Sequence, residues 1–149
     1  MATLHNERTI RASREKLWGI LSNLEELEKY DPTVLRSVAI STGITGPGAA
    51  RKVEMKEGKN WFNEKITTWK PGEELSYQLT ACSFPVSSLS HSYTFEEAGE
   101  GVRVKQVMDY TVKFGWLGRL MDWLMIEKQT QSGIDKFFDG LKKYSEQKN

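Results

Sequence analysis

Apolar and polar residues alternate through the middle of the chain, which is the pattern of β-strands that are buried on one face. Between Val34 and Phe114 the alternation is interrupted by four segments rich in turn-forming residues: 43–48, 57–60, 70–72 and 99–101. Short turns of this kind join antiparallel strands, because each turn reverses the direction of the chain. This part of the sequence therefore predicts a meander of antiparallel strands.

The side-chain period of two assigns residues of each strand to a face. In the last strand, the interior face carries the apolar residues Val102, Val104, Met108, Tyr110, Val112 and Phe114. Its opposite face carries Arg103, Lys105, Asp109 and Lys113. Three earlier sets are assigned inward in the same way: Phe62, Glu64, Ile66 and Thr68; Leu75, Tyr77 and Leu79; His91, Tyr93 and Phe95. Trp61 and Trp69 have the opposite parity to the first set, which leaves the register of that strand open.

Apolar residues at helical spacing lie before the predicted strands. Ser13 is a residue type that caps helix N-termini, and apolar residues follow it at helical spacing: Leu17, Trp18, Ile20 and Leu21. Asn23, followed three residues later by Glu26, imitates a capping box and predicts a second short helix. That helix must end near Tyr30, because the residue before Pro32 is disfavoured in the helical conformation.

The C-terminal segment, residues 117–147, has no proline and repeats apolar residues at helical spacing. Its predicted buried stripe consists of Leu117, Leu120, Leu124, Gln131, Ile134, Phe138, Leu141 and Tyr144. A helix of about thirty residues is about 45 Å long and cannot bury this stripe alone, so we expect it across the concave face of the sheet. With residues 4–11 as the first strand, the predicted fold is α+β: one strand, two short helices, six strands and one long helix.

Composition narrows the class of protein. The 149 residues fit one domain, 1–149, and 21 basic against 20 acidic residues give no field that would attract nucleic acid. Cys82 is the only cysteine, which excludes an intrachain disulfide and is compatible with a reducing cytoplasm. Residues 1–10 lack the apolar block of a signal peptide, and the longest uncharged stretch, 75–95, is too polar to cross a bilayer. We therefore expect a cytoplasmic protein without a nucleic-acid partner or stable membrane insertion.

Five short segments carry a resemblance to a known family: Ser13 to Trp18, Tyr30-Asp31-Pro32, Gly46 to Arg51, Glu64 to Gly72 and Gly101 to Val104. In this order they resemble the polyketide cyclase/dehydrase branch of the START/Bet v 1-like (SRPBCC) superfamily, over nearly the whole chain. The resemblance implies a helix-grip fold, in which a curved seven-stranded antiparallel sheet wraps around a long C-terminal helix. It also implies a cavity between sheet and helix for a hydrophobic or amphipathic small molecule.

Two titratable residues on the predicted inner face are candidates for chemistry. A carboxylate at Glu64 must be paired, hydrated or protonated, so it is either a cavity acid or the partner of an arginine such as Arg51 or Arg103. His91 is the best candidate for proton transfer, or else a hydrogen-bonded wall residue. Neither histidine has a cysteine or second histidine at ligand spacing, so we predict no metal.

Other residues are candidate ligand contacts. Tyr77 and Gln106 are polar tips on an apolar surface, and they either contact a ligand or satisfy each other or a buried water. The predicted apolar walls, which ordinary core packing explains equally well, are Tyr30, Met55, Met108, Trp123 and Leu124. The apolar cluster from Trp116 to Met125 is either buried against the first helices or exposed as a lid, a dimer contact or a docking site.

These features leave three functions open. The favoured one is binding, or transport, of a lipid, quinone or polyketide-like aromatic by a monomer or homodimer. The second is a cyclase or dehydratase without a cofactor, in which His91 and Glu64 transfer protons and Tyr77 or Gln106 stabilises an enolate-like oxygen. The third is a co-chaperone or antitoxin-like interaction module that acts through the surface of the long helix.

Overall fold

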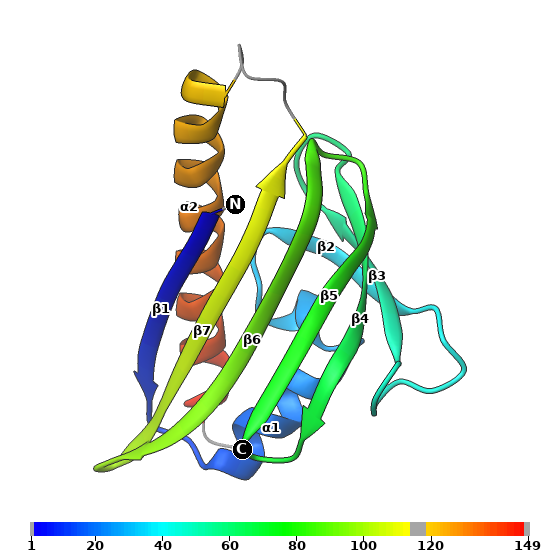
Figure 1. The fold of residues 1–149 in the computed structure, drawn as a ribbon. Coiled ribbons are helices and arrows are strands. Elements are labelled where there is room, and N and C mark those ends of the chain that lie inside the picture. The colour runs from blue at the N-terminus through cyan, green and yellow to red at the C-terminus, as the bar shows by residue number, and fades with distance from the viewer. Residues whose placement is uncertain (1, 114–118, 148–149) are drawn as a thin grey trace.

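One curved antiparallel sheet and one long helix make up most of the computed structural model, which describes residues 2–113 and 119–147 and, for 119–123, the backbone alone (Figure 1). The elements are β1 (Ala2–Ile10), α1 (Arg14–Ser22), the 3-10 turn η1 (Leu27–Lys29), β2 (Val34–Ala39), β3 (Ala50–Met55), β4 (Trp61–Lys70), β5 (Glu74–Cys82), β6 (Val86–Ala98), β7 (Gly101–Val112) and α2 (Arg119–Ser145). This order confirms the predicted α+β helix-grip fold.

The sheet has the strand order β1-β7-β6-β5-β4-β3-β2, and every pair is antiparallel. From β2 to β7 each strand pairs with its neighbour in sequence, as the turn-rich segments predict. β1 closes the other side of the sheet by pairing with β7, so the N-terminal and last strands lie side by side (Figure 1). α2 lies on the concave side of the curved sheet (Figure 1).

The structure agrees with the predicted start of the first helix but not with that of the second. Ser13 caps α1 as predicted, since its hydroxyl accepts a hydrogen bond from the Lys16 amide at 3.1 Å. The second short helix is present only as the 3-10 helix η1, which ends before Tyr30 as predicted, whereas residues 23–26 are not helical. The Asn23 carboxamide accepts from the Glu25 amide at 3.0 Å, which closes a local turn instead of capping a helix.

A bulge in β4 settles the register that the two tryptophans leave open. The pairing with β5 shifts between Ile66 and Thr68, so residues beyond this point change faces. Trp69 therefore turns inward beside Leu75, and its ring meets that of Trp18 edge to face at 5.1 Å. The inward assignment of Glu64 and Ile66 is confirmed, whereas that of Thr68 is wrong.

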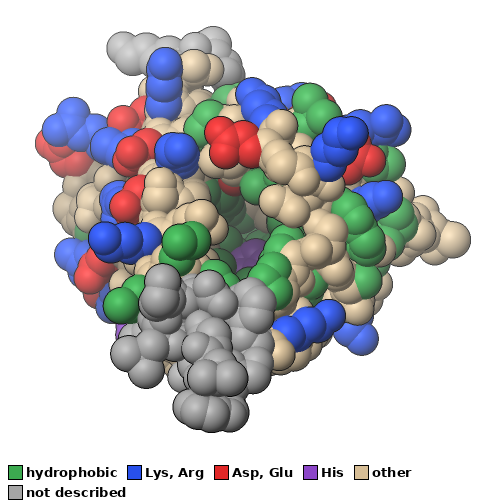
Figure 2. All heavy atoms as spheres, turned by 90° about the horizontal axis from the view of Figure 1, so that it is seen from above, with side chains coloured by type: hydrophobic (Ala, Val, Ile, Leu, Met, Phe, Trp, Pro, Cys, Tyr) green, Lys and Arg blue, Asp and Glu red, His purple; other side chains and the backbone are tan. Residues whose placement is uncertain are grey.

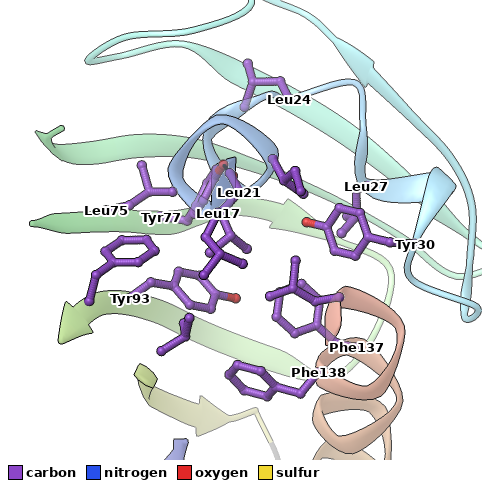
Figure 3. Close-up of a cluster of buried hydrophobic side chains, with 14 of the residues drawn as sticks. Leu17, Leu21, Leu24, Leu27, Tyr30, Leu75, Tyr77, Tyr93, Phe137 and Phe138 are labelled. Atoms are coloured by element: carbon purple, nitrogen blue, oxygen red, sulfur yellow. Dashed lines mark hydrogen bonds between the residues drawn. The ribbon is translucent and has the colours of Figure 1, made fainter. Parts of the chain in front are cut away.

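Side chains from α1, the sheet and the C-terminal half of α2 fill one half of the concave face, which we call the packed half (Figure 3). On α2, the buried members of the predicted stripe are Ile134, Phe138 and Leu141. Leu124 is 55% exposed, so its place in the buried stripe is wrong. Burial along the described side chains of α2 begins only at Ile134, since the first turns of the helix lie beyond the packed half. Phe114, Leu117 and the side chain of Leu120 lie outside the described residues.

Gly140 allows α2 to approach the segment that joins η1 to β2. A Cβ atom built at residue 140 would overlap the backbone carbonyl of Tyr30 and would also meet Pro32. By contrast, a Cβ atom at Gly133, two turns earlier on the same helix, would meet nothing within 4 Å. The close contact at 140 therefore depends on the absence of a side chain.

We expect Gly140→Ala to lower the free energy of unfolding by about 1–3 kcal/mol, because the overlap outweighs the better helix propensity of alanine. Gly133→Ala is the matched control and should raise it by about 0.4–1 kcal/mol, since only the gain in propensity acts there. Urea unfolding followed by circular dichroism measures both changes. A Gly140→Ala protein as stable as the wild type would contradict the close approach.

Candidate functional site

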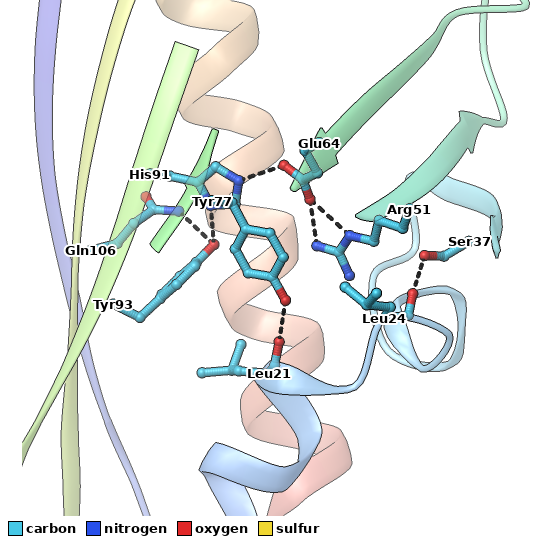
Figure 4. A network of polar contacts seen from close by, with 9 residues as sticks. All are labelled: Leu21, Leu24, Ser37, Arg51, Glu64, Tyr77, His91, Tyr93 and Gln106. Atoms are coloured by element: carbon cyan, nitrogen blue, oxygen red, sulfur yellow. Dashed lines mark hydrogen bonds and ion pairs between the residues drawn. The ribbon is translucent and has the colours of Figure 1, made fainter. Parts of the chain in front are cut away.

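Five buried polar side chains form a hydrogen-bonded network across the concave face (Figure 4). We call them the polar network: Arg51 on β3, Glu64 on β4, His91 and Tyr93 on β6, and Gln106 on β7. Because residues two apart in a strand share a face, and direct cross-strand partners lie side by side, the sheet brings these positions together without any loop.

The centre of the polar network is an ion pair between cross-strand partners. Arg51 Nε and Nη2 lie 2.8 and 2.6 Å from Glu64 Oε2, and the Glu64 residue is only 1% exposed. The Arg51 guanidinium also sits 4.6 Å from the centre of the Tyr77 ring. Burial alone would raise the pKa of Glu64, but the charges and hydrogen bonds of Arg51 and His91 outweigh it and lower this pKa to about 2. Glu64 is therefore ionised at neutral pH.

The ionised carboxylate sets the direction of its own hydrogen bond with His91. Glu64 can only accept, so His91 Nε2, 2.7 Å from Glu64 Oε1, carries a proton. His91 Nδ1 lies 3.0 Å from the Tyr93 hydroxyl, and the Tyr93 oxygen accepts from Gln106 Nε2 at 3.0 Å. Burial raises the pKa of Tyr93 well above its ordinary value, so its hydroxyl keeps its proton.

Tyr77 has a structural contact at its polar end. Its ring stacks on that of His91 with centroids 5.1 Å apart, and its hydroxyl donates to the backbone carbonyl of Leu21 at 2.8 Å. Burial raises the pKa of Tyr77 to about 12. The hydroxyl thus fastens the end of α1 to β5. The alternative in which Tyr77 and Gln106 satisfy each other is wrong, since Gln106 donates to Tyr93 instead.

The structure brings the two candidates for proton transfer together. Glu64 and His91 lie on the same face in direct contact, and Glu64 is the partner of Arg51 rather than of Arg103. Arg103 lies on the opposite face of β7, where it pairs with Glu7 and Glu96. Of the two readings for Glu64, the structure therefore favours the arginine partner, although the carboxylate also orients His91.

Beyond the packed half, the molecule is hollowed. Seen from the end at which β7 finishes, a depression with mostly apolar walls has a histidine at its base (Figure 2). Of the two histidines in the sequence, His5 is exposed on β1 and His91 is buried, 8% exposed, on the concave face, so the histidine at the base is His91. We call this depression the hollow. Partly buried apolar residues of the same face lie around the polar network: Leu4, Met55, Phe62 and Met108.

The predicted apolar walls are distributed unevenly. Met55 and Met108 are partly exposed on the concave face, as a wall of the hollow requires. Tyr30 instead belongs to the packed half, where its ring lies 5.7 Å from that of Phe137 and 5.8 Å from that of Tyr144. Leu124 is mostly exposed on α2. The side chain of Trp123, and most of the cluster from 116 to 125, lie outside the described residues.

A second polar cluster, which was not predicted from the sequence, joins β1 to α2 and is only partly buried. The Arg8 guanidinium pairs with Asp135 at 3.0 Å, and the Gln131 amide nitrogen donates both to Asp135, at 3.0 Å, and to Asn6 Oδ1, at 2.7 Å. The signal was present in the first strand, where Leu4, Asn6, Arg8 and Ile10 share one parity. Tyr93 was placed inward but was given no role in the site.

Two further observations concern metal binding and membrane spans. Within residues 2–113 and 119–147, no three His, Cys, Asp or Glu side chains are grouped so that they could hold a metal ion. No helix in this part of the chain is both long enough and apolar enough to cross a membrane.

A comparison with models of known protein families identifies the family to which the chain belongs. Residues 1–146 match the model of the family described as "Polyketide cyclase / dehydrase and lipid transport". The chain therefore belongs to this family. A search of curated proteins finds no match.

Solved structures share the whole fold at low sequence identity. Zhui aromatase/cyclase from Streptomyces sp. R1128 superposes with a TM-score of 0.84 at 10% identity, covering 97% of this chain and 93% of that one. A START superfamily protein from Mycobacterium smegmatis gives 0.78 at 13% identity, with 97% of each chain covered. Ara h 8.0201 gives 0.75 at 17% identity, also with 97% of each chain covered. At these identities the likeness concerns the fold alone.

We expect Glu64→Gln to lower the free energy of unfolding by about 3–5 kcal/mol, because it leaves the Arg51 charge buried without a counter-ion. Replacing both partners, as Arg51→Met with Glu64→Leu, should restore much of this loss, since no buried charge remains. Urea unfolding at pH 7 measures both. A double variant that is less stable than Glu64→Gln would contradict the account.

The same ion pair should make stability depend on pH in the acid range. The pKa of Glu64 is about 2 in the folded protein against an ordinary value of 4.5, so the folded state binds this proton less readily than the unfolded state. Its contribution is therefore complete above pH 4.5 and is lost as the pH falls from there toward 2. Wild-type protein should lose stability relative to the double variant over this window, and parallel curves would contradict the prediction.

Proposed function

We propose that the protein binds an amphipathic small molecule in the hollow, with the apolar part against the sheet and the polar part toward the polar network. The observation that carries this proposal is the hollow itself, which has apolar walls and a buried histidine at its base (Figure 2). Ligand sites in proteins combine mostly apolar walls with a few fixed polar groups in this way. The lipid transport named in the family description supports the same class of ligand.

The geometry of His91 favours binding over catalysis. Both ring nitrogens are engaged by protein groups, Nε2 by Glu64 and Nδ1 by Tyr93. A general base needs a nitrogen that can reach the proton it removes, and neither nitrogen is free to do so in this arrangement. The polar network therefore serves first as a rigid, hydrogen-bonded floor for a bound molecule.

The walls suit ligands of varied shape. Met55 and Met108 have flexible, polarisable side chains that can adapt to different apolar surfaces, while Phe62 offers a flat one. Burial of a ligand here gains roughly 25 cal/mol for each Å² of apolar surface removed from water. A lipid, a quinone or a polyketide-like aromatic each offers such a surface together with a polar end.

Filling the hollow should abolish binding without unfolding the protein. Met108 faces the hollow from β7, whereas its neighbour Val107 points to the opposite face and is 36% exposed. We expect Met108→Trp to weaken binding of the neutral fluorescent probe N-phenyl-1-naphthylamine roughly tenfold or more, because the indole occupies its place. Val107→Trp is the matched control and should bind as the wild type does. Equal affinities of both variants and the wild type would place the probe outside the hollow.

The Glu64–His91 contact supports a second candidate, a cyclase or dehydratase that needs no cofactor. A carboxylate 2.7 Å from a histidine can orient it and stabilise its protonated form. In this case a substrate oxygen would take the place of the Tyr93 hydroxyl at Nδ1. The Zhui aromatase/cyclase, which shares the fold, supports the candidate by name.

Measurements of turnover and of the dissociation constant distinguish catalysis from binding. If the protein is a cyclase, His91→Gln should lower turnover of a linear polyketide substrate by about 10²-fold or more while its dissociation constant changes little. Tyr77→Phe is the control, since the Tyr77 hydroxyl donates to the backbone carbonyl of Leu21 and not to His91 or Glu64. If wild-type protein binds the substrate but releases it unchanged, the binding function stands and the enzymatic candidate is rejected.

A further inference from the structure

The polar network ends at an acceptor without a partner. Gln106 is 2% exposed, and its amide nitrogen donates to the Tyr93 hydroxyl at 3.0 Å (Figure 4). Its other amide atom, Oε1, is therefore a carbonyl oxygen. Among the described residues this buried oxygen has no hydrogen-bond partner. An orphaned buried acceptor costs free energy, so its presence calls for an explanation.

The second polar cluster ends at a donor without a partner. Asp135 can only accept, so the Gln131 amide presents its nitrogen both to Asp135 and to Asn6. Asn6 must then meet Gln131 with its oxygen, Oδ1, which leaves Nδ2 as a donor. This nitrogen is also buried, and the described part of the chain offers it no partner.

These two orphaned atoms belong to direct cross-strand partners. Asn6 on β1 faces Gln106 on β7 in the register of the sheet, and both side chains lie on the concave face. Side chains at such positions lie about 5 Å apart at their Cβ atoms. The residue that carries the free donor and the residue that carries the free acceptor are thus opposite each other on neighbouring strands. The next pair on the same face, Leu4 and Met108, is apolar and only partly buried.

We propose that Asn6 and Gln106 form a recognition site for a neutral hydroxyl group of the bound molecule. A hydroxyl oxygen accepts from Asn6 Nδ2 while its hydrogen is donated to Gln106 Oε1, so one group satisfies both atoms. A carboxylate cannot do so, because it would face the Gln106 oxygen with another acceptor. A hydrocarbon would leave both atoms unsatisfied. This inference rests on the proposed function and narrows its ligand to an apolar alcohol or phenol.

Three naphthalene probes of similar size test this selectivity by isothermal titration calorimetry: 2-naphthol, 2-methylnaphthalene and 2-naphthoate. Wild-type protein should bind 2-naphthol about tenfold more tightly than 2-methylnaphthalene, the gain expected from satisfying two buried polar groups. The 2-naphthoate anion should bind most weakly. Similar affinities for all three would overturn the hydroxyl site and leave the proposed function standing, whereas no binding of any probe would overturn both.

A single substitution removes the donor and keeps the acceptor that Gln131 uses. Asn6→Asp replaces Nδ2 by an oxygen, so the preference for 2-naphthol over 2-methylnaphthalene should shrink to about twofold or less. The matched control is Asn60→Asp, the same change in the exposed turn between β3 and β4, which should keep the wild-type preference. A full preference in Asn6→Asp would overturn the proposal. If that variant does not fold, the wild-type comparison decides alone.

A crystal structure of the 2-naphthol complex separates the hydroxyl site from a simple water site. The probe oxygen should lie within hydrogen-bond distance of both Asn6 Nδ2 and Gln106 Oε1. A water molecule between these two atoms, with the naphthol bound elsewhere, would overturn the proposal.

Discussion

The buried ion pair between Arg51 and Glu64 is the constraint on which the concave face depends. An ionised carboxylate in this position must be satisfied on every side, because an unpaired buried charge is far more costly than the pair. Arg51 supplies the opposite charge, and His91 supplies the remaining donor. Side chains from β3, β4 and β6 are thereby locked in one arrangement. The resulting floor is polar but rigid, and it is built entirely on strands.

This floor divides the concave face into two parts with different roles. On one side, α1 and the C-terminal half of α2 close against the sheet, and the Gly140 approach and the Tyr77–Leu21 hydrogen bond hold them there. Beyond it, Leu4, Met55, Phe62 and Met108 are only partly buried. One curved sheet cannot close on one straight helix along its full length, so a hollow remains where packing ends. The hollow is a direct consequence of this geometry.

Much of this architecture could be predicted from local rules. Period-two patterns placed Glu64, Tyr77 and His91 on one face, and the Ser13 cap marked the start of α1. The bulge after Ile66 could not be predicted, because a parity change needs knowledge of the partner strand. The second helix is shorter than predicted, because a local turn at Asn23 takes the place of its first residues. The parity of the first strand places Asn6 on the inner face, but it does not give its contact with Gln131 at the opposite end of the chain.

The central claim is that a small molecule occupies the hollow above the polar network. A crystal structure of the protein saturated with N-phenyl-1-naphthylamine tests it most directly. The account predicts electron density for the probe between the sheet and α2, in contact with Met55 and Met108 and next to His91. A hollow filled by the protein's own side chains, with the probe on the outer surface, would contradict it.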